Sequence, residues 1–216
     1  MATRTPEPDL FEPWDPGEAD RQREAMMFGL WLFLATEVLF FGGLFLLYAH
    51  ARIFDGSSFA EGAREANAWF GTTNTAILLT SSMTATVAER AIRGGRVRLA
   101  RWGWVATAAL GILFLAVKGM EYAEDLREHL FPGPLFRFHS AGATEFWNFY
   151  WVITMVHAIH LSVGIALMVR LLWLDHRGVA ARRWQGAEVT TTYWHLVDMV
   201  WITLYPLIYL VGRGHG

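Results

Sequence analysis

Five apolar stretches run along the sequence, each long enough to cross a bilayer, and polar or Pro-containing segments separate them. They lie at about 27–49, 69–88, 102–122, 146–174 and 190–211. A transmembrane helix needs about 20 apolar residues, and continuous runs favour helices over the alternating pattern of a barrel. The pattern predicts an all-α, polytopic membrane protein with five transmembrane helices. The fourth stretch exceeds what a bilayer requires, so we expect it to tilt or to project.

The remaining sequence predicts one membrane domain, 26–213, preceded by a tail. Residues 1–25 are rich in Pro and charge, and they do not have the basic start and short apolar core of a signal peptide. We interpret them as a cytoplasmic N-terminal tail. The longest connection, about 123–145, contains LFPGPLF, whose two prolines disfavour a helix.

Arginine is distributed unevenly between the two sides of the predicted helices. Twelve Arg lie in the tail, the second connection and the fourth, against five on the opposite side. Basic residues favour the cytoplasmic side, so we expect the N-terminus inside and the C-terminus outside. Four Arg of the fourth connection are expected to hold phospholipid headgroups at that face. They are Arg170, Arg177, Arg182 and Arg183.

Ionisable side chains inside the apolar stretches are functional candidates, because a charge at membrane depth is costly. Glu37 shares a helix face with Phe41, Leu44 and Tyr48. It is either a carboxylate that takes part in proton movement or a hydrogen-bonded acid that joins helices.

Two of the later stretches contain ionisable residues at helical spacing. Lys118 and Glu121 are three apart, which predicts a structural ion pair near one helix end. His195 and Asp198 are also three apart, and we expect them in a polar interhelical network.

His157 and His160 share one face of the fourth predicted helix. Two such His also suit a metal or a haem, but a tight site needs further ligands and the chain has no Cys to supply them. We interpret both as structural His held by hydrogen bonds.

Composition agrees with a membrane protein. The chain is 54% hydrophobic and 18% charged, whereas a soluble domain carries roughly 25% charge. A net charge of −2 gives no indication of nucleic-acid binding. Eleven Trp suit the interfacial belts of a bilayer.

The chain resembles subunit III of the haem–copper respiratory oxidases, in a five-helix bacterial form. The matching stretches, one in each predicted helix and in family order, are ATEVLFFGGLFLLYAH (35–50), NTAILLTSSMTATVAERAI (74–92), LFLAVKGMEY (113–122), MVHAIHLSVG (155–164) and EVTTTYWHLVDMVWITLYPLIYL (188–210). The last is the most specific, because Glu188 precedes His195 by seven positions and Asp198 and Trp201 follow it.

The resemblance implies a V-shaped bundle with two helices separated from the rest by a lipid-filled cleft. It implies an accessory, non-catalytic subunit of an oxidoreductase complex in a bacterial plasma membrane, packed on subunit I and assembled with subunit II. Haem and copper belong to the partner subunits, this chain has no cofactor of its own, and a structural phospholipid is expected. The positions that match the family's polar signature are Glu37, Asn74, Glu121, His157, His160, Glu188, His195, Asp198 and Trp201.

Some features depart from the family pattern and leave alternatives open. Seven-helix members have two further helices at the start, Glu89 lies where some members have His, and Lys118 where some have Gln. Association with a cytochrome c oxidase, a quinol oxidase or a nitric oxide reductase is left open. A small proton-coupled transporter is a weaker alternative, since no repeated halves are evident, and a protein binding metal or haem through His157, His160 and His195 is another.

Overall fold

The computed structural model describes residues 16–54, 56–176 and 184–210. These residues form six α-helices and one π-helical turn, and the described part of the chain contains no strand. The elements are α1 (Pro16–Phe54), α2 (Gly56–Glu65), α3 (Ala68–Arg93), α4 (Val97–Arg127), α5 (Ala141–His176), α6 (Trp184–Tyr205) and η1 (Pro206–Leu210). The predicted all-α class is therefore confirmed.

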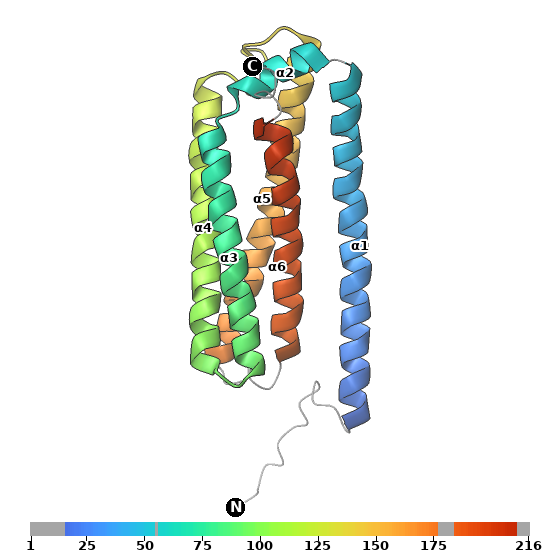
Figure 1. Ribbon diagram of the computed structural model, residues 1–216, viewed down its shortest axis with the longest axis vertical. Coiled ribbons are helices and arrows are strands. Elements are labelled where there is room, and N and C mark those ends of the chain that lie inside the picture. The colour runs from blue at the N-terminus through green and yellow to red at the C-terminus, as the bar shows by residue number, and fades with distance from the viewer. Residues whose placement is uncertain (1–15, 55, 177–183, 211–216) are drawn as a thin grey trace, which may run out of the picture.

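Helices α3, α4, α5 and α6 form a bundle, and α1 stands beside it (Figure 1). The short helix α2 crosses one end of the bundle and connects α1 to α3. The helix α1 begins at Pro16, where the fixed φ of proline suits a first helical turn. Residues 16–25, which we assigned to the tail, are therefore helical.

The side chain of Trp194 on α6 fills the centre of the bundle and is fully buried. A Cβ added at Gly111 of α4 or at Gly164 of α5 would lie within 3.0 Å of its indole ring. The indole nitrogen donates a hydrogen bond to Ser81 Oγ of α3 at 3.1 Å. Trp194 therefore contacts all three other helices of the bundle, and the two glycines leave room for its ring.

The amphipathic helix α2 has no counterpart among the predicted elements. Phe59 is buried and packs edge-on against Phe146 of α5 and against Tyr48 of α1. Gly62 lies against Ala143 of α5, where an added Cβ would lie 3.2 Å from the Ala143 Cα atom. The helix α2 thus fixes the end of α1 against the start of α5.

The last helix changes its hydrogen-bond pattern at Pro206. Proline has no backbone N–H and its ring crowds the preceding turn, and a π-helical turn follows immediately over η1. Within η1, Ile208 and Tyr209 are buried. The Leu207 carbonyl accepts a hydrogen bond from Tyr48 Oη at 2.5 Å, which links α1 to this turn.

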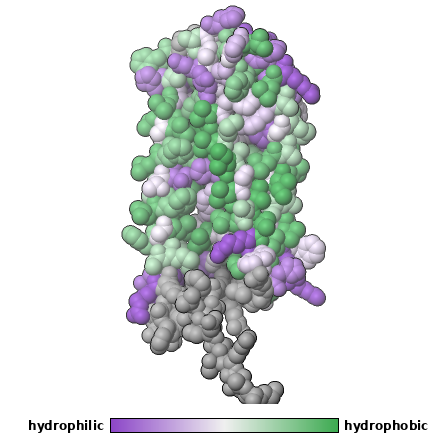
Figure 2. All heavy atoms as spheres, turned by 180° about the vertical axis from the view of Figure 1, so that it is seen from behind, coloured by the Kyte–Doolittle hydropathy of each residue, from purple (hydrophilic) through white to green (hydrophobic). Residues whose placement is uncertain are grey.

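Large apolar side chains lie on the outside of the bundle along its length. Trp31, Leu39, Met83, Ile159 and Met199 are each at least half exposed. Figure 2 shows hydrophobic residues dominating the middle of one face, with hydrophilic residues gathered towards its two ends. A surface of this kind suits a surrounding lipid phase.

Three helical segments within the described residues are long and apolar enough to cross a membrane. They are Arg23–Phe54, Val97–Arg127 and Ala141–His176. The helices α3 and α6, which contain several Ser and Thr, are not among these three, although both lie at positions where we predicted spans.

Candidate functional site

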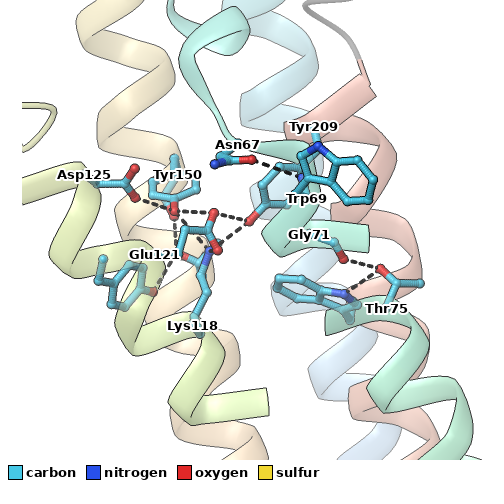
Figure 3. A network of polar contacts seen from close by, with 12 residues as sticks. Asn67, Trp69, Gly71, Thr75, Lys118, Glu121, Asp125, Tyr150 and Tyr209 are labelled. Atoms are coloured by element: carbon cyan, nitrogen blue, oxygen red, sulfur yellow. Dashed lines mark hydrogen bonds and ion pairs between the residues drawn. The ribbon is translucent and has the colours of Figure 1, made fainter. Parts of the chain in front are cut away.

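The densest group of buried polar side chains surrounds Lys118 on α4, near the α2 end of the bundle (Figure 3). Lys118 Nζ lies 3.0 Å from Glu121 Oε2, so the pair predicted from the spacing forms. The ammonium also donates to Tyr150 Oη of α5 at 3.1 Å and to Tyr209 Oη of η1 at 2.9 Å. All three N–H donors of the lysine are therefore used.

Aromatic rings enclose the Lys118 ammonium. Its nitrogen lies 4.5 Å from the ring centre of Tyr150, 5.0 Å from that of Tyr122, 5.6 Å from that of Tyr209 and 5.7 Å from that of Trp201. The lysine side chain is 2% exposed. A buried charge needs an ion pair and hydrogen bonds to be tolerated, and cation–π contacts add to them here.

Three members of this group were not predicted from the sequence. Asp125 Oδ2 lies 2.7 Å from Tyr150 Oη, and Tyr209 Oη donates to Glu121 Oε1 at 2.6 Å. Asp125 is one helical turn beyond Glu121, so i, i+4 spacing could have found it. Tyr150 and Tyr209 come from other segments, and spacing alone carried no signal for either.

A second group of polar side chains lies around Trp201 of α6. The indole nitrogen donates to Thr75 Oγ1 of α3 at 3.1 Å, and the ring packs edge-on against Phe114 of α4. The His157 ring lies 5.1 Å from the Trp201 ring, between centroids. Trp201 thus brings α3, α4 and α5 together at the helix α6.

His157 and Asn74 are buried but have no hydrogen bond from their side-chain nitrogens or oxygens to any described residue. The expectation that His157 is held by hydrogen bonds is therefore wrong. The His157 imidazole contacts the rings of Phe114 and Trp201 instead, since aromatic side chains occupy the positions around it. Asn74 lies at the bundle-facing side of α3.

Glu37 contacts His160, and this pair connects α1 to α5. Glu37 Oε2 lies 2.9 Å from His160 Nε2. The His160 Nδ1 atom is 2.8 Å from the Val156 carbonyl, which can only accept, so Nδ1 carries a proton. The predicted face of α1 is confirmed, because Phe41 packs on the His160 ring and both Phe41 and Tyr48 are buried.

The imidazole of His195 on α6 hydrogen-bonds to two hydroxyls of α3. Ser82 Oγ lies 2.7 Å from Nδ1 and Thr86 Oγ1 lies 3.2 Å from Nε2. The Thr86 hydroxyl donates its own proton to the Ser82 carbonyl. Thr86 therefore accepts from Nε2–H and Ser82 donates to Nδ1, which satisfies a neutral imidazole.

Asp198 lies beside this network. Its Oδ2 lies 4.0 Å from His195 Nδ1, beyond hydrogen-bond distance. Both carboxyl oxygens are buried, and the Ser82 side chain, which hydrogen-bonds to His195, also interacts with the Asp198 carboxyl. Ser82 of α3 is therefore the group that relates His195 and Asp198 to each other.

Glu188 belongs to a charged group at the end of the bundle opposite α2. Its carboxylate lies 3.1 Å from Arg93 and 3.8 Å from Arg23. Arg93 also pairs with Glu89 on its own helix at 2.5 Å. Glu89, which occupies a position where some family members have His, thus contributes to a contact between α3 and α6.

Of the four lipid-headgroup candidates, Arg170 is exposed near the end of α5. Arg177, Arg182 and Arg183 lie outside the described residues. Within the described ranges, no group of three or more His, Asp or Glu side chains lies close enough together to hold a metal ion. His157, His160 and His195 do not converge, because each contacts a different set of partners.

Comparison with known proteins shows the family directly. Residues 18–213 match the family model described as cytochrome c oxidase subunit III. The chain belongs to this family. All five stretches that carried the resemblance lie inside the matched region, so the predicted family is confirmed.

Members of the subunit III family from several organisms are similar to the chain over most of its length. It is 33% identical to cytochrome c oxidase subunit 3 of Thermostichus vulcanus, over 86% of this chain and 87% of that protein. It is also 33% identical to cytochrome c oxidase subunit 3 of Synechocystis, over 98% and 88%. It is 30% identical to a heme-copper oxidase subunit I+III of Aeropyrum pernix, over 94% of this chain and 24% of that protein.

Proposed function

We propose that the chain is the accessory, non-redox subunit III of a haem–copper terminal oxidase in aerobic electron transport. In this role it packs on the catalytic subunit I, is assembled with subunit II and supports proton uptake by the complex. The observation that carries the proposal is the subunit III family match over residues 18–213. Haem and copper then belong to the partner subunits.

Contact with subunit I is supported by the relative from Aeropyrum pernix. Its name joins subunit I and subunit III, and this chain matches 24% of its length. Two subunits that function as one polypeptide in a relative are good candidates for neighbours in a complex. We therefore place the chain beside subunit I in the bacterial plasma membrane.

In the proposed membrane arrangement, α1, α3, α4, α5 and α6 all cross the bilayer. The helices α3 and α6 have 26 and 22 residues, and at about 1.5 Å per residue each is as long as a hydrocarbon core is thick. The arginine-rich end carries Arg93 and would face the cytoplasm, with the α2 end outside. One helix, α1, stands beside the four-helix bundle, whereas the resemblance implied two helices set apart from the rest.

The accessory role can be tested on the oxidase itself. The complex purified from cells without this chain should keep its haem spectrum and its initial rate of oxygen reduction. Its rate during sustained turnover should fall faster, and proton uptake should slow, relative to the complex that contains the chain. Loss of haem from the complex lacking the chain would contradict a non-redox, accessory role.

Glu37 is proposed to support the integrity of the complex rather than to carry transported protons. Its described ion-pair contact is with His160, a histidine rather than another acid. The variant Glu37→Gln should retain proton pumping in whatever complex assembles. Normal assembly combined with reduced pumping would contradict this proposal, and the exposed carboxyl of Glu124 provides a control through Glu124→Gln.

A structural phospholipid is proposed at the arginine-rich end. Arg170 is exposed there, and Arg177, Arg182 and Arg183 follow it in the sequence. Anionic headgroups are attracted by clustered basic residues. Native mass spectrometry should show a retained phospholipid that is lost when these Arg are replaced by Gln, and identical retention would contradict the proposal.

The electron donor of the complex is proposed to be cytochrome c, with quinol as the second candidate. The relatives from Thermostichus vulcanus and Synechocystis are both named cytochrome c oxidase subunit 3. One observation favours quinol, namely 27% identity to quinol oxidase subunit 3 of Bacillus spizizenii over 86% of this chain. Oxygen consumption by the purified complex with each reduced donor in turn distinguishes the two.

A further inference from the structure

The group around Lys118 contains more short oxygen–oxygen contacts than its phenol protons can form hydrogen bonds for. Tyr209 Oη lies 2.6 Å from Glu121 Oε1, Tyr150 Oη lies 2.9 Å from the same oxygen, and Tyr150 Oη also lies 2.7 Å from Asp125 Oδ2. Each of these three contacts is at hydrogen-bond distance and needs a proton. The two phenols supply only two.

Lys118 cannot provide the missing proton. Its three N–H groups point to Glu121 Oε2, Tyr150 Oη and Tyr209 Oη, and an ammonium has no further donor. Tyr150 has one O–H and so donates to Glu121 or to Asp125, but not fully to both. The third proton must therefore come from a carboxylic acid, on one of these two residues.

Electrostatics decides which carboxyl carries the proton. Lys118 Nζ lies 3.0 Å from Glu121 Oε2 and makes no contact of this kind with Asp125. A unit positive charge stabilises the nearest carboxylate most strongly, so Glu121 is the ionised partner. We propose that Asp125 is a carboxylic acid whose proton is bound between Asp125 Oδ2 and Tyr150 Oη, in a closed and electroneutral site.

This assignment satisfies every contact in the group. Asp125 donates to Tyr150, Tyr150 and Tyr209 donate to Glu121 Oε1, and Lys118 donates to Glu121 and to both phenols. The charges reduce to one ammonium and one carboxylate. Two ionised carboxyls would leave an excess negative charge among side chains that are 5% exposed or less, which is strongly unfavourable.

No other charged group of this region takes the place of the proton assigned to Asp125. Glu124, Glu128 and His129 lie near Asp125 in sequence but are exposed to solvent. The segments α5 and η1 present the phenols of Tyr150 and Tyr209 to the group, and neither is a cation. The ligand of the site is thus a single proton, and the site does not depend on which oxidase the chain belongs to.

Infrared spectroscopy of the full-length chain in lipid vesicles tests the assignment. A protonated carboxyl has a carbonyl stretching band separate from the bands of carboxylates. In the wild-type chain such a band should shift on labelling with [4-13C]aspartate and on transfer to D2O. Asp125→Asn should remove it, and the control Glu124→Gln should leave it unchanged.

A second variant keeps the proposal testable if Asp125→Asn does not fold. Tyr150→Phe retains Asp125 but removes the acceptor of its proton, so the aspartate-sensitive band should move to higher frequency. Buried acids elsewhere, including Asp198, are unaffected by this change because they do not contact Tyr150. No Tyr150-sensitive acid band, or one that shifts with labelled glutamate instead of aspartate, would overturn the proposal.

Discussion

The contact between α3 and α4 depends on Gly103, and replacing it by alanine is a direct test of the packing. A Cβ at Gly103 would lie 2.6 Å from Ala88 Cβ and 3.1 Å from both Ala88 Cα and the Thr84 carbonyl. These atoms belong to a helix backbone or are attached directly to it, so no flexible side chain can move away. The two helices would have to separate by roughly 1 Å to restore ordinary carbon–carbon contact distances.

The free-energy change follows from three contributions. Overpacking of this kind costs about 1–3 kcal/mol. Separation also stretches the hydrogen bond between Thr84 Oγ1 and Thr107 Oγ1, now 2.8 Å, at a cost of about 1 kcal/mol. Replacing glycine by alanine in a helix increases stability by about 1 kcal/mol, because alanine has the higher helix propensity. Gly103→Ala should therefore destabilise the chain by roughly 1–3 kcal/mol.

Gly119 on the same helix provides a matched control. An added Cβ there meets no atom within 4 Å, so Gly119→Ala should gain the helix propensity alone, about 1 kcal/mol. Both variants can be compared by denaturation of the purified chain in mixed detergent micelles, followed by tryptophan fluorescence. If Gly103→Ala is as stable as Gly119→Ala, then α3 and α4 do not pack in the way described.

Two further predictions concern buried contacts of the candidate site. Lys118→Met leaves Glu121 buried without its cation, so the chain should lose about 3–5 kcal/mol of stability, and Lys118→Met combined with Glu121→Gln should recover part of the loss in the same denaturation assay. Trp201→Phe removes the indole hydrogen bond to Thr75, at a cost of about 0.5–1.5 kcal/mol, and the smaller ring leaves a cavity at a fully buried position that adds to this loss. The double variant with Thr75→Val should lose less stability than the sum of the losses in the two single variants. Fully additive losses would show that the hydrogen bond is unimportant.

The helical class and the positions of the long helices could be predicted from the sequence, because apolar runs of bilayer length directly specify helices. The helix α2 was missed, since the ten residues GSSFAEGARE are mostly small or polar and contain one large apolar side chain, that of Phe59. Its helical form depends on tertiary contacts, in which Phe59 packs against Phe146 and Tyr48. The start of α1 was also missed, because the helix extends from the apolar stretch back into the charged residues that precede it.

Pairs within one helix were predictable, whereas partners between helices were not. The spacing of Lys118 and Glu121 sufficed to predict their ion pair, but nothing in the sequence places His160 of α5 beside Glu37 of α1. The same spacing argument suggested His195 and Asp198 as members of one network. It could not identify Ser82 of α3, which hydrogen-bonds to the imidazole and also interacts with the Asp198 carboxyl.

We propose that the chain belongs to a haem–copper oxidase complex as subunit III, without haem of its own. The most direct measurement is a mild-detergent pulldown of the tagged chain, with a reduced-minus-oxidised absorption spectrum and mass spectrometry of the proteins that accompany it. We expect haem bands together with a large subunit I partner. A colourless chain that purifies alone as a stable oligomer would contradict it.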